Sequence, residues 1–156
     1  MANYESVVLS NQVRVKKPQE LIKVLETLGF DEWSITGEDV IAFGSTVTCF
    51  DIDQMNVVRS NEGEVIGVSS DFMESPELLD DNIKVEDGWH EQPFTEYIQE
   101  QLYDDTQYLF VKEIGHEKLR YVVAYGCVIT KTDVHWIDID REIDSYLKAN
   151  NLPSIL

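Results

Sequence analysis

A run of alternating apolar and polar residues in the last third of the chain constrains the fold most. From residue 119 to residue 130, apolar side chains recur at every second position, from Leu119 to Ile129. Successive side chains of a β-strand point to opposite faces, so this period of two predicts a strand with one face on a core. Residues 107–114 and 134–139 read as two further strands, separated from the first by short polar segments at 115–118 and 131–133. The sequence therefore predicts an antiparallel strand meander over about residues 107–139.

The other face of the middle strand has a different character. It carries small side chains, those of Val122, Ala124, Gly126 and Val128. Such residues allow a helix to approach the sheet closely. A helix is expected directly after the meander, from about residue 140 to residue 149, with an apolar side formed by Ile143, Tyr146 and Leu147. Asp138 or Asp140 can cap its first turn.

The N-terminal part predicts a β-α-β-hairpin unit. Residues 6–15 alternate around Asn11-Gln12, and residues 18–28 have a helical apolar stripe that begins near Pro18 and stops before Gly29. Residues 33–36 and 40–43 read as a hairpin, and residues 47–52 as one more short strand. In the middle, a strand is expected at 65–69, a turn or short helix at 75–79 and a helix at 93–103. We expect one α+β domain spanning residues 1–156.

Negative charge is concentrated in the middle of the chain. The protein has 30 acidic and 12 basic residues among 156, for a net charge of −18. Residues 62–105 contain fourteen of these acids and a single base, Lys84, for a net charge of −13. Apolar residues such as Val68, Phe94 and Ile98 are interleaved with the acids, which an acidic tail would lack. We therefore expect an ordered segment that packs its apolar side and turns its carboxylates outward, although the course of residues 53–92 is not readable in detail.

Crowding of one charge sign destabilises a folded chain through self-repulsion, so it is often kept where the field has a use. The alternative interpretation is a solvated face that only keeps the protein dissolved. If the segment is a binding surface, Trp89 is a candidate aromatic anchor. The expected partner-binding residues are Asp71, Glu74, Glu77, Asp80, Asp81, Glu86, Asp87, Trp89, Glu91, Glu96 and Glu100.

Several classes of function are poorly supported by the sequence. Direct nucleic-acid binding needs clustered lysine and arginine, and the bases are scattered. The chain has no phosphate-binding glycine loop, no nucleophile elbow and no paired cysteines, so we expect no enzyme and no cofactor. No run of 18 apolar residues and no secretion signal is present, so a cytoplasmic protein without membrane contact is expected. Cys49 and Cys127 lie in apolar stretches, where buried thiols are expected.

Two acid pairs leave a metal site open as an alternative. Asp51 and Asp53 stand two residues apart, as do Asp138 and Asp140, so each pair shares a face if extended. Brought together, two such pairs would offer hard oxygen ligands for Mg²⁺ or Ca²⁺. A small metal-dependent enzyme or sensor would combine them with His116, the best acid–base candidate. Neither pair continues as a calcium-binding loop, and a structural role for the aspartates is the stronger interpretation.

In size and charge the chain resembles small acidic accessory proteins of phages and mobile elements, including DNA-mimic inhibitors of restriction and CRISPR systems. This resemblance implies an inhibitor that occludes a basic, nucleic-acid-binding protein, as an anti-restriction or anti-CRISPR protein does. Duplex DNA presents about one negative charge per 1.7 Å, and an ordered row of carboxylates can compete for the same groove. An immunity protein or antitoxin that caps a basic toxin would use the same physics. A homodimer is a further expectation if the strand at 119–130 lies at a sheet edge.

Overall fold

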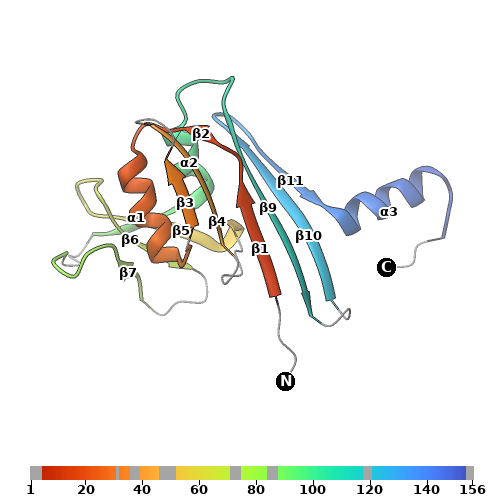
Figure 1. Ribbon diagram of the computed structural model, residues 1–156, viewed down its shortest axis with the longest axis horizontal. Coiled ribbons are helices and arrows are strands. Elements are labelled where there is room, and N and C mark those ends of the chain that lie inside the picture. Colours follow the sequence, from red (N-terminus) through yellow and green to blue (C-terminus); the bar gives the residue numbers. More distant parts are fainter. Residues whose placement is uncertain are drawn as a thin grey trace.

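The computed structural model describes residues 5–30, 32–35, 39–45, 52–70, 75–83, 88–117 and 121–153. The elements in chain order are β1 (Glu5–Ser10), β2 (Val13–Arg14), α1 (Pro18–Leu28), β3 (Glu32–Ile35), β4 (Val40–Ser45), the 3-10 turn η1 (Ile52–Gln54), β5 (Met55–Arg59), β6 (Val65–Ser70), β7 (Glu77–Leu78), β8 (His90–Pro93), α2 (Phe94–Gln101), β9 (Tyr108–Glu117), β10 (Tyr121–Thr130), β11 (Val134–Asp138) and α3 (Ile139–Ala149). The described elements form two antiparallel sheets with helices beside them, which confirms the α+β class (Figure 1).

The larger sheet contains the predicted meander. Its strand order is β11-β10-β9-β1-β4-β2, and β3 pairs with β4. The N-terminal strand β1 lies in the middle of this sheet, between β9 and β4, so the two ends of the sequence share one sheet. β10 is paired on both sides over Tyr125–Ile129, with β9 and β11, whereas Tyr121–Ala124 pair with β9 alone. The strand expected at 119–130 is therefore an edge strand only over its first part, and the homodimer expected from an exposed edge stays a prediction.

The first hairpin of the meander is longer than the sequence predicted. A turn was expected at 115–118, but β9 continues through Glu117. Gly115 pairs with Val123 and His116 pairs with Val122, so both residues lie within the strand. Glycine weakens a strand by itself, but ten consecutive pairs between β9 and β10 hold it in place. His116 therefore does not project from a hairpin tip.

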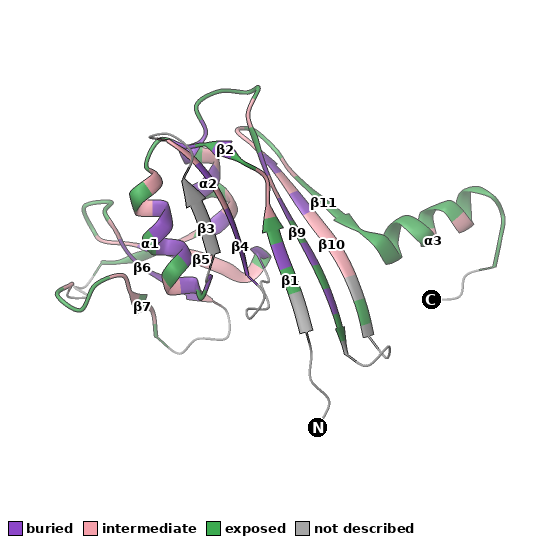
Figure 2. Cartoon of the chain, viewed as in Figure 1, coloured by how far each residue is buried: buried purple, intermediate pink, exposed green. Residues whose placement is uncertain are grey.

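Helix α1 has the bounds that its sequence predicts. Pro18 occupies the first turn, where a missing N–H costs nothing, and Gly29 ends the helix at φ 100°. One face buries Leu21, Leu25 and neighbouring apolar residues in the core. Each fully buried side chain of this kind contributes about 1.5–3 kcal/mol through the hydrophobic effect. Burial of this face fixes the helix against the sheets (Figure 2).

The smaller sheet has the order β7-β6-β5-β8 and leads directly into α2. β6 confirms the strand expected at 65–69, and α2 confirms the helix expected at 93–103 with shorter bounds. The turn or short helix expected at 75–79 is instead the two-residue strand β7. Gly67 of β6 lies so close to β7 that an added Cβ would be 2.5 Å from the carbonyl oxygen of Glu77. The strand expected at 47–52 lies outside the described residues except for Ile52, which belongs to η1.

Both sheets, α1 and α2 contribute to one hydrophobic core. Its members include Val8, Leu21, Leu25, Val57, Val68, Phe94, Ile98, Leu109, Cys127 and Ile129. The core ends before the distal part of the β9–β10–β11 meander. No residue of α3 is buried, and the helix extends away from the sheet (Figures 1 and 2). Among the described helices, none combines the length and the apolar character needed to cross a membrane.

Candidate functional site

The described acids of residues 62–105 are all on the surface. Ten of the fourteen fall in the described ranges, and each of the ten is exposed. They are Glu62, Glu64, Glu77, Asp80, Asp81, Glu91, Glu96, Glu100, Asp104 and Asp105. The apolar residues between them, such as Ile66, Tyr97 and Leu102, are buried. Because the buried residues fix the backbone, the carboxylates stand on an ordered scaffold, as the interleaved sequence predicts.

The expected partner-binding residues divide into two groups. Asp71, Glu74, Glu86 and Asp87 lie outside the described residues. The remaining seven are exposed at the small sheet, its turns and α2: Glu77, Asp80, Asp81, Trp89, Glu91, Glu96 and Glu100. Trp89 is 37% exposed and precedes β8 directly. Its partly exposed ring beside this group of acids keeps it a candidate anchor.

The small sheet presents these acids on both of its faces. Glu77 of β7 aligns through Val68 and Val57 with Gln92 of β8. The next register line joins Leu78, Gly67 and Val58 to Glu91. Residues on one register line share a face, and neighbouring lines alternate, so Glu77 and Glu91 point to opposite sides. The acids therefore wrap around an edge of the molecule and do not form one flat layer.

Arg59 joins the small sheet to α2 within the acidic portion, that is, residues 62–105 with their exposed carboxylates. Nη2 of Arg59, in β5, pairs with Oε2 of Glu100 in α2 at 2.7 Å. Its Nε donates to Gln92 and its Nη1 donates to the carbonyl oxygen of Gly63. Gln92 also donates to Oε1 of Glu100, at 2.7 Å. Glu100 is the only one of the ten described acids that forms an ion pair with a described base, so the other nine stay available to a partner.

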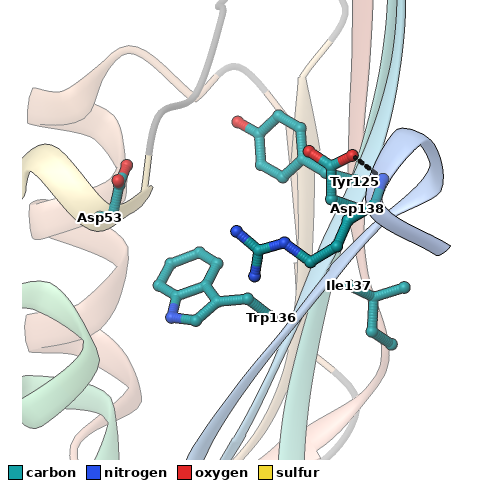
Figure 3. A pocket seen from close by; sticks show the side chains of 6 residues that line it. Asp53, Tyr125, Trp136, Ile137 and Asp138 are labelled. Atoms are coloured by element: carbon teal, nitrogen blue, oxygen red, sulfur yellow. Dashed lines mark hydrogen bonds between the residues drawn. The ribbon is translucent and has the colours of Figure 1, made fainter. Parts of the chain in front are cut away.

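A cavity lies where the meander extends beyond the core, and it is a second candidate site. The cavity has a volume of about 430 Å³ and is lined by Asp53, Tyr125, Trp136, Ile137, Asp138 and Arg141. Asp53, on η1, stands across the opening from Tyr125 and Trp136 of the sheet (Figure 3). The guanidinium of Arg141 has no hydrogen-bond or ion-pair partner among the described residues. An arginine beside an indole ring is suited to holding a planar carboxylate or a phosphate.

The structure brings one aspartate of each acid pair to this cavity, but not as a metal site. Asp138 uses its Oδ1 to accept from the backbone N–H groups of Asp140 and Arg141, at 2.9 and 3.2 Å, so it caps α3 as expected. Asp51 lies outside the described residues. His116 is far along β9 and pairs with Val122. Over the described part of the chain, no three histidine, cysteine, aspartate or glutamate side chains form a group that could hold a metal ion.

Two buried polar groups near the cavity serve the structure. The hydroxyl of Tyr125 donates a hydrogen bond to the carboxylate of Glu113, which is only 2% exposed. Burial, and to a lesser extent the negative charge of Asp53, raise the pKa of the Cys127 thiol to about 12. The thiolate is the nucleophilic form, so Cys127 is unreactive near neutral pH. Its place in the core agrees with the expected buried thiol, and it forms no disulfide.

Sequence reasoning missed the residues that organise these sites. Arg59 was not singled out because it lies just before the acidic segment, and no local pattern shows that it pairs with a residue 41 positions later. Trp136 and Arg141 gave a weak signal, an aromatic residue and a base beside the Asp138 cap. Only the register of β10 with β11, which sets Trp136 opposite Cys127, places them at the cavity.

Comparison of the chain with protein-family models, with curated proteins and with solved structures gives no match.

Proposed function

We propose that this protein is an acidic binding protein that occludes the basic, nucleic-acid-binding surface of another protein. The observation that carries the proposal is the set of ten exposed carboxylates of residues 62–105 on a folded scaffold, nine of them without an ion pair to a described base. A rigid array of charges loses less entropy on binding than a disordered tail does. It therefore presents ordered negative charges to a basic groove, as the phosphates of duplex DNA do.

Charge also predicts how such a complex responds to salt. Lysine and arginine side chains of a nucleic-acid-binding groove hold condensed or loosely bound anions and attract a negative surface at long range. The complex should therefore form fast at low ionic strength and weaken as salt is added, because the Debye length falls to about 10 Å at 0.1 M. The proposal places the encounter in the cytoplasm, where inhibitors of nucleic-acid-handling proteins meet their targets.

The test is capture of partners from a host-cell lysate on the immobilised full chain at low and moderate salt. A variant with Glu77→Gln, Asp80→Asn and Asp81→Asn removes three exposed charges of the acidic portion. Asn at residue 80 keeps the oxygen that accepts from the backbone N–H of Asn82, so the turn is preserved. A captured protein should be released by added duplex DNA. The variant should bind it more weakly, and its salt slope should be smaller by about one unit for each carboxylate in contact.

A matched control separates local contacts from net charge. The variant with Glu26→Gln, Asp133→Asn and Glu142→Gln neutralises three acids that are exposed elsewhere on the molecule. It has the same net charge as the first variant and should retain the interaction. The proposal is wrong if duplex DNA does not compete, or if both variants bind the captured protein as the unmodified chain does.

A further inference from the structure

The outer face of the meander is an exposed and largely apolar surface. Its register lines join Val7 to Ile114 to Ala124, and Gly126 to Ile137. The described side chains on this face are Val7, Leu9, Tyr108, Phe110, Lys112, Ile114, His116, Val122, Ala124, Gly126, Val128, Thr130, His135 and Ile137. None of these fourteen is acidic, and the register places one acid, Glu5, on the same face opposite His116. A surface with so few acids differs from the one proposed to attract a basic partner.

Large apolar side chains on this face are open to solvent. Ile114 is 60% exposed and Val122 is 59% exposed. Between them and the sheet edge lies a hollow of about 340 Å³, floored by the small residues Ala124 and Gly126. Contiguous exposed apolar surface on a folded chain marks an interaction site. The small residues leave room for a helix, as their sequence predicts, yet no described helix lies along the face.

Helix α3 has the complementary surface. Ile139, Ile143 and Tyr146 form an apolar stripe along it, and Tyr146 is 65% exposed. Acids flank this stripe, including Asp140 and Glu142, while Lys112 lies on the outer face between Leu9 and Gly126. The helix therefore matches the face in both its apolar character and its charge. It is also amphipathic without being buried, a combination that isolated helices of 11 residues do not sustain well in water.

The connection between β11 and α3 keeps the helix from covering its own sheet. Asp138 is the last residue of β11 and also the N-cap of α3, so no loop residue separates them. Turning a helix back onto the preceding strand takes a loop of about 2–6 residues. Only the first turn reaches the hollow, where Ile139 and Glu142 contribute to the lining. The remaining length, within a helix of about 16 Å, extends past the sheet edge (Figure 1).

We propose that two copies of this protein form a symmetric dimer in which α3 of each copy packs on the outer face of the meander of the other. The exchange is reciprocal, as a two-fold axis requires. Because each copy uses both its helix and its face, the two contacts together cover the apolar stripe of α3 and part of the outer face on each side. The acidic portion is left free, so the dimer is independent of the proposed inhibitory function.

Salt has opposite effects on the two associations. Each copy has a net charge of −18, so the copies repel one another at long range. Added salt screens this repulsion and leaves the apolar contacts intact. The dimer should therefore tighten as salt is added, whereas a complex of the acidic portion with a basic partner should loosen. Sedimentation equilibrium of the purified full chain, over a range of concentrations at low and moderate salt, measures the dimer constant directly.

Two variants place the contact. Ile143→Glu adds a charge to the apolar stripe of α3, and Val122→Glu adds one to the sheet face. Each should raise the dissociation constant of the dimer by about thirtyfold, as loss of a central contact does. Ser145→Glu adds the same charge to the opposite side of α3, and Thr132→Glu adds it to the exposed β10–β11 turn. Both controls should dimerise as the unmodified chain does, and circular dichroism verifies the fold of all four.

Mixing the variants tests whether the helix is exchanged. An equimolar mixture of Ile143→Glu and Val122→Glu contains one intact helix and one intact face, which can meet in a mixed dimer. The mixture should therefore dimerise more tightly than either variant alone. A chain that stays monomeric at every concentration and salt overturns the proposal. So does a dimer that survives both variants, or one that the mixture fails to restore.

Discussion

Arg59 and Glu100 form an ion pair in which the two partners have unequal surroundings: the side chain of Arg59 is 19% exposed and that of Glu100 is 57% exposed. The pair joins the small sheet to α2. The guanidinium also lies over the ring of Tyr97, with 5.9 Å between Cζ and the ring centroid. Arg59 thus makes several contacts largely shielded from solvent, while Glu100 makes its contacts where its side chain is mostly exposed to water.

We expect substitutions of the two partners to differ in their effect on stability. Arg59→Ala leaves the oxygens of Gln92 and Gly63 without their donor and removes the contact with Tyr97, so it should lower the free energy of unfolding by about 2 kcal/mol. Glu100→Gln should cost about 0.5 kcal/mol or less, because exposed ion pairs contribute little. Denaturant titrations of both variants measure the difference. Equal losses would show that the ion pair itself, and not the anchoring of Arg59, holds these elements together.

A chain of hydrogen bonds joins α1 to α2 through a buried tyrosine. The hydroxyl of Tyr97 donates to Glu20 at 3.0 Å and accepts from Gln101 at 3.0 Å, and Gln101 accepts from the backbone N–H of Lys17. Tyr97→Phe leaves the buried amide of Gln101 without this acceptor and should cost about 1.5 kcal/mol. Tyr103→Phe, at an exposed ring, should change the free energy of unfolding by less than about 0.5 kcal/mol. Thermal unfolding of both variants provides the measurement.

The same tyrosine predicts a loss of stability at high pH. Burial raises the pKa of Tyr97 above its usual value of 10, and the negative charge of Glu20 raises it further. Above pH 10 the phenol ionises in the unfolded chain while the folded chain retains the proton. The unfolded state therefore binds fewer protons, and the free energy of unfolding falls as pH rises. The fall above pH 10 should be shallower in Tyr97→Phe, and identical slopes would contradict this assignment.

Cys127 should contribute a similar loss at a lower onset. Its thiol ionises near pH 9 when unfolded but only near pH 12 in the folded core, because burial raises its pKa. Stability should fall over that window, and less steeply in Cys127→Ala. In a Cys49→Ser background Cys127 is the only thiol of the chain. A thiol reagent at neutral pH should then label it only after denaturant is added, and rapid labelling of the folded protein would contradict its buried position.

The cap of α3 should affect the helix without affecting the core. Asp138→Ala removes the side-chain oxygen that accepts from the N–H groups of Asp140 and Arg141, which lowers helix stability by about 1 kcal/mol. No residue of α3 is buried within one chain, so at concentrations that keep the protein monomeric the midpoint of global unfolding should stay nearly unchanged. Amide exchange over residues 139–149 should become faster. A large shift of the global midpoint would show that α3 packs on the core in solution.

Local signals in the sequence were sufficient to predict an element where the sequence shows both its periodicity and the residues that begin and end it. Pro18, the apolar stripe and Gly29 together define α1 at its observed bounds. The alternation in 119–130 likewise gave β10, because a period of two is read within one strand. Gly115-His116 misled because a glycine followed by polar residues looks like a turn. Its strand conformation comes from pairing with β10, which depends on residues further along the chain.

Pairings between distant segments could not be predicted from the sequence. The division into two sheets depends on which strand meets which, and a two-residue strand such as β7 has no period to detect. The exposure of the acidic residues followed from their interleaving with apolar ones, which is a local property. The capture of Glu100 by Arg59 and the separation of Glu77 from Glu91 by a sheet both depend on strand register. The exposed apolar face on the outer side of the meander was not predicted either, because its small residues had suggested that a helix approaches it closely.

The position of β1 has a consequence for how the protein is made. Val7 of β1 is paired with Ile114 of β9, which is synthesised 107 residues later. β1 can pair with β4 early, but its other side stays without a partner until β9 has been synthesised. Contacts of such large sequence separation slow folding, and an unpaired strand edge is a site of aggregation in the meantime. The yield of folded protein should therefore depend on how long β1 stays unpaired on one side during synthesis.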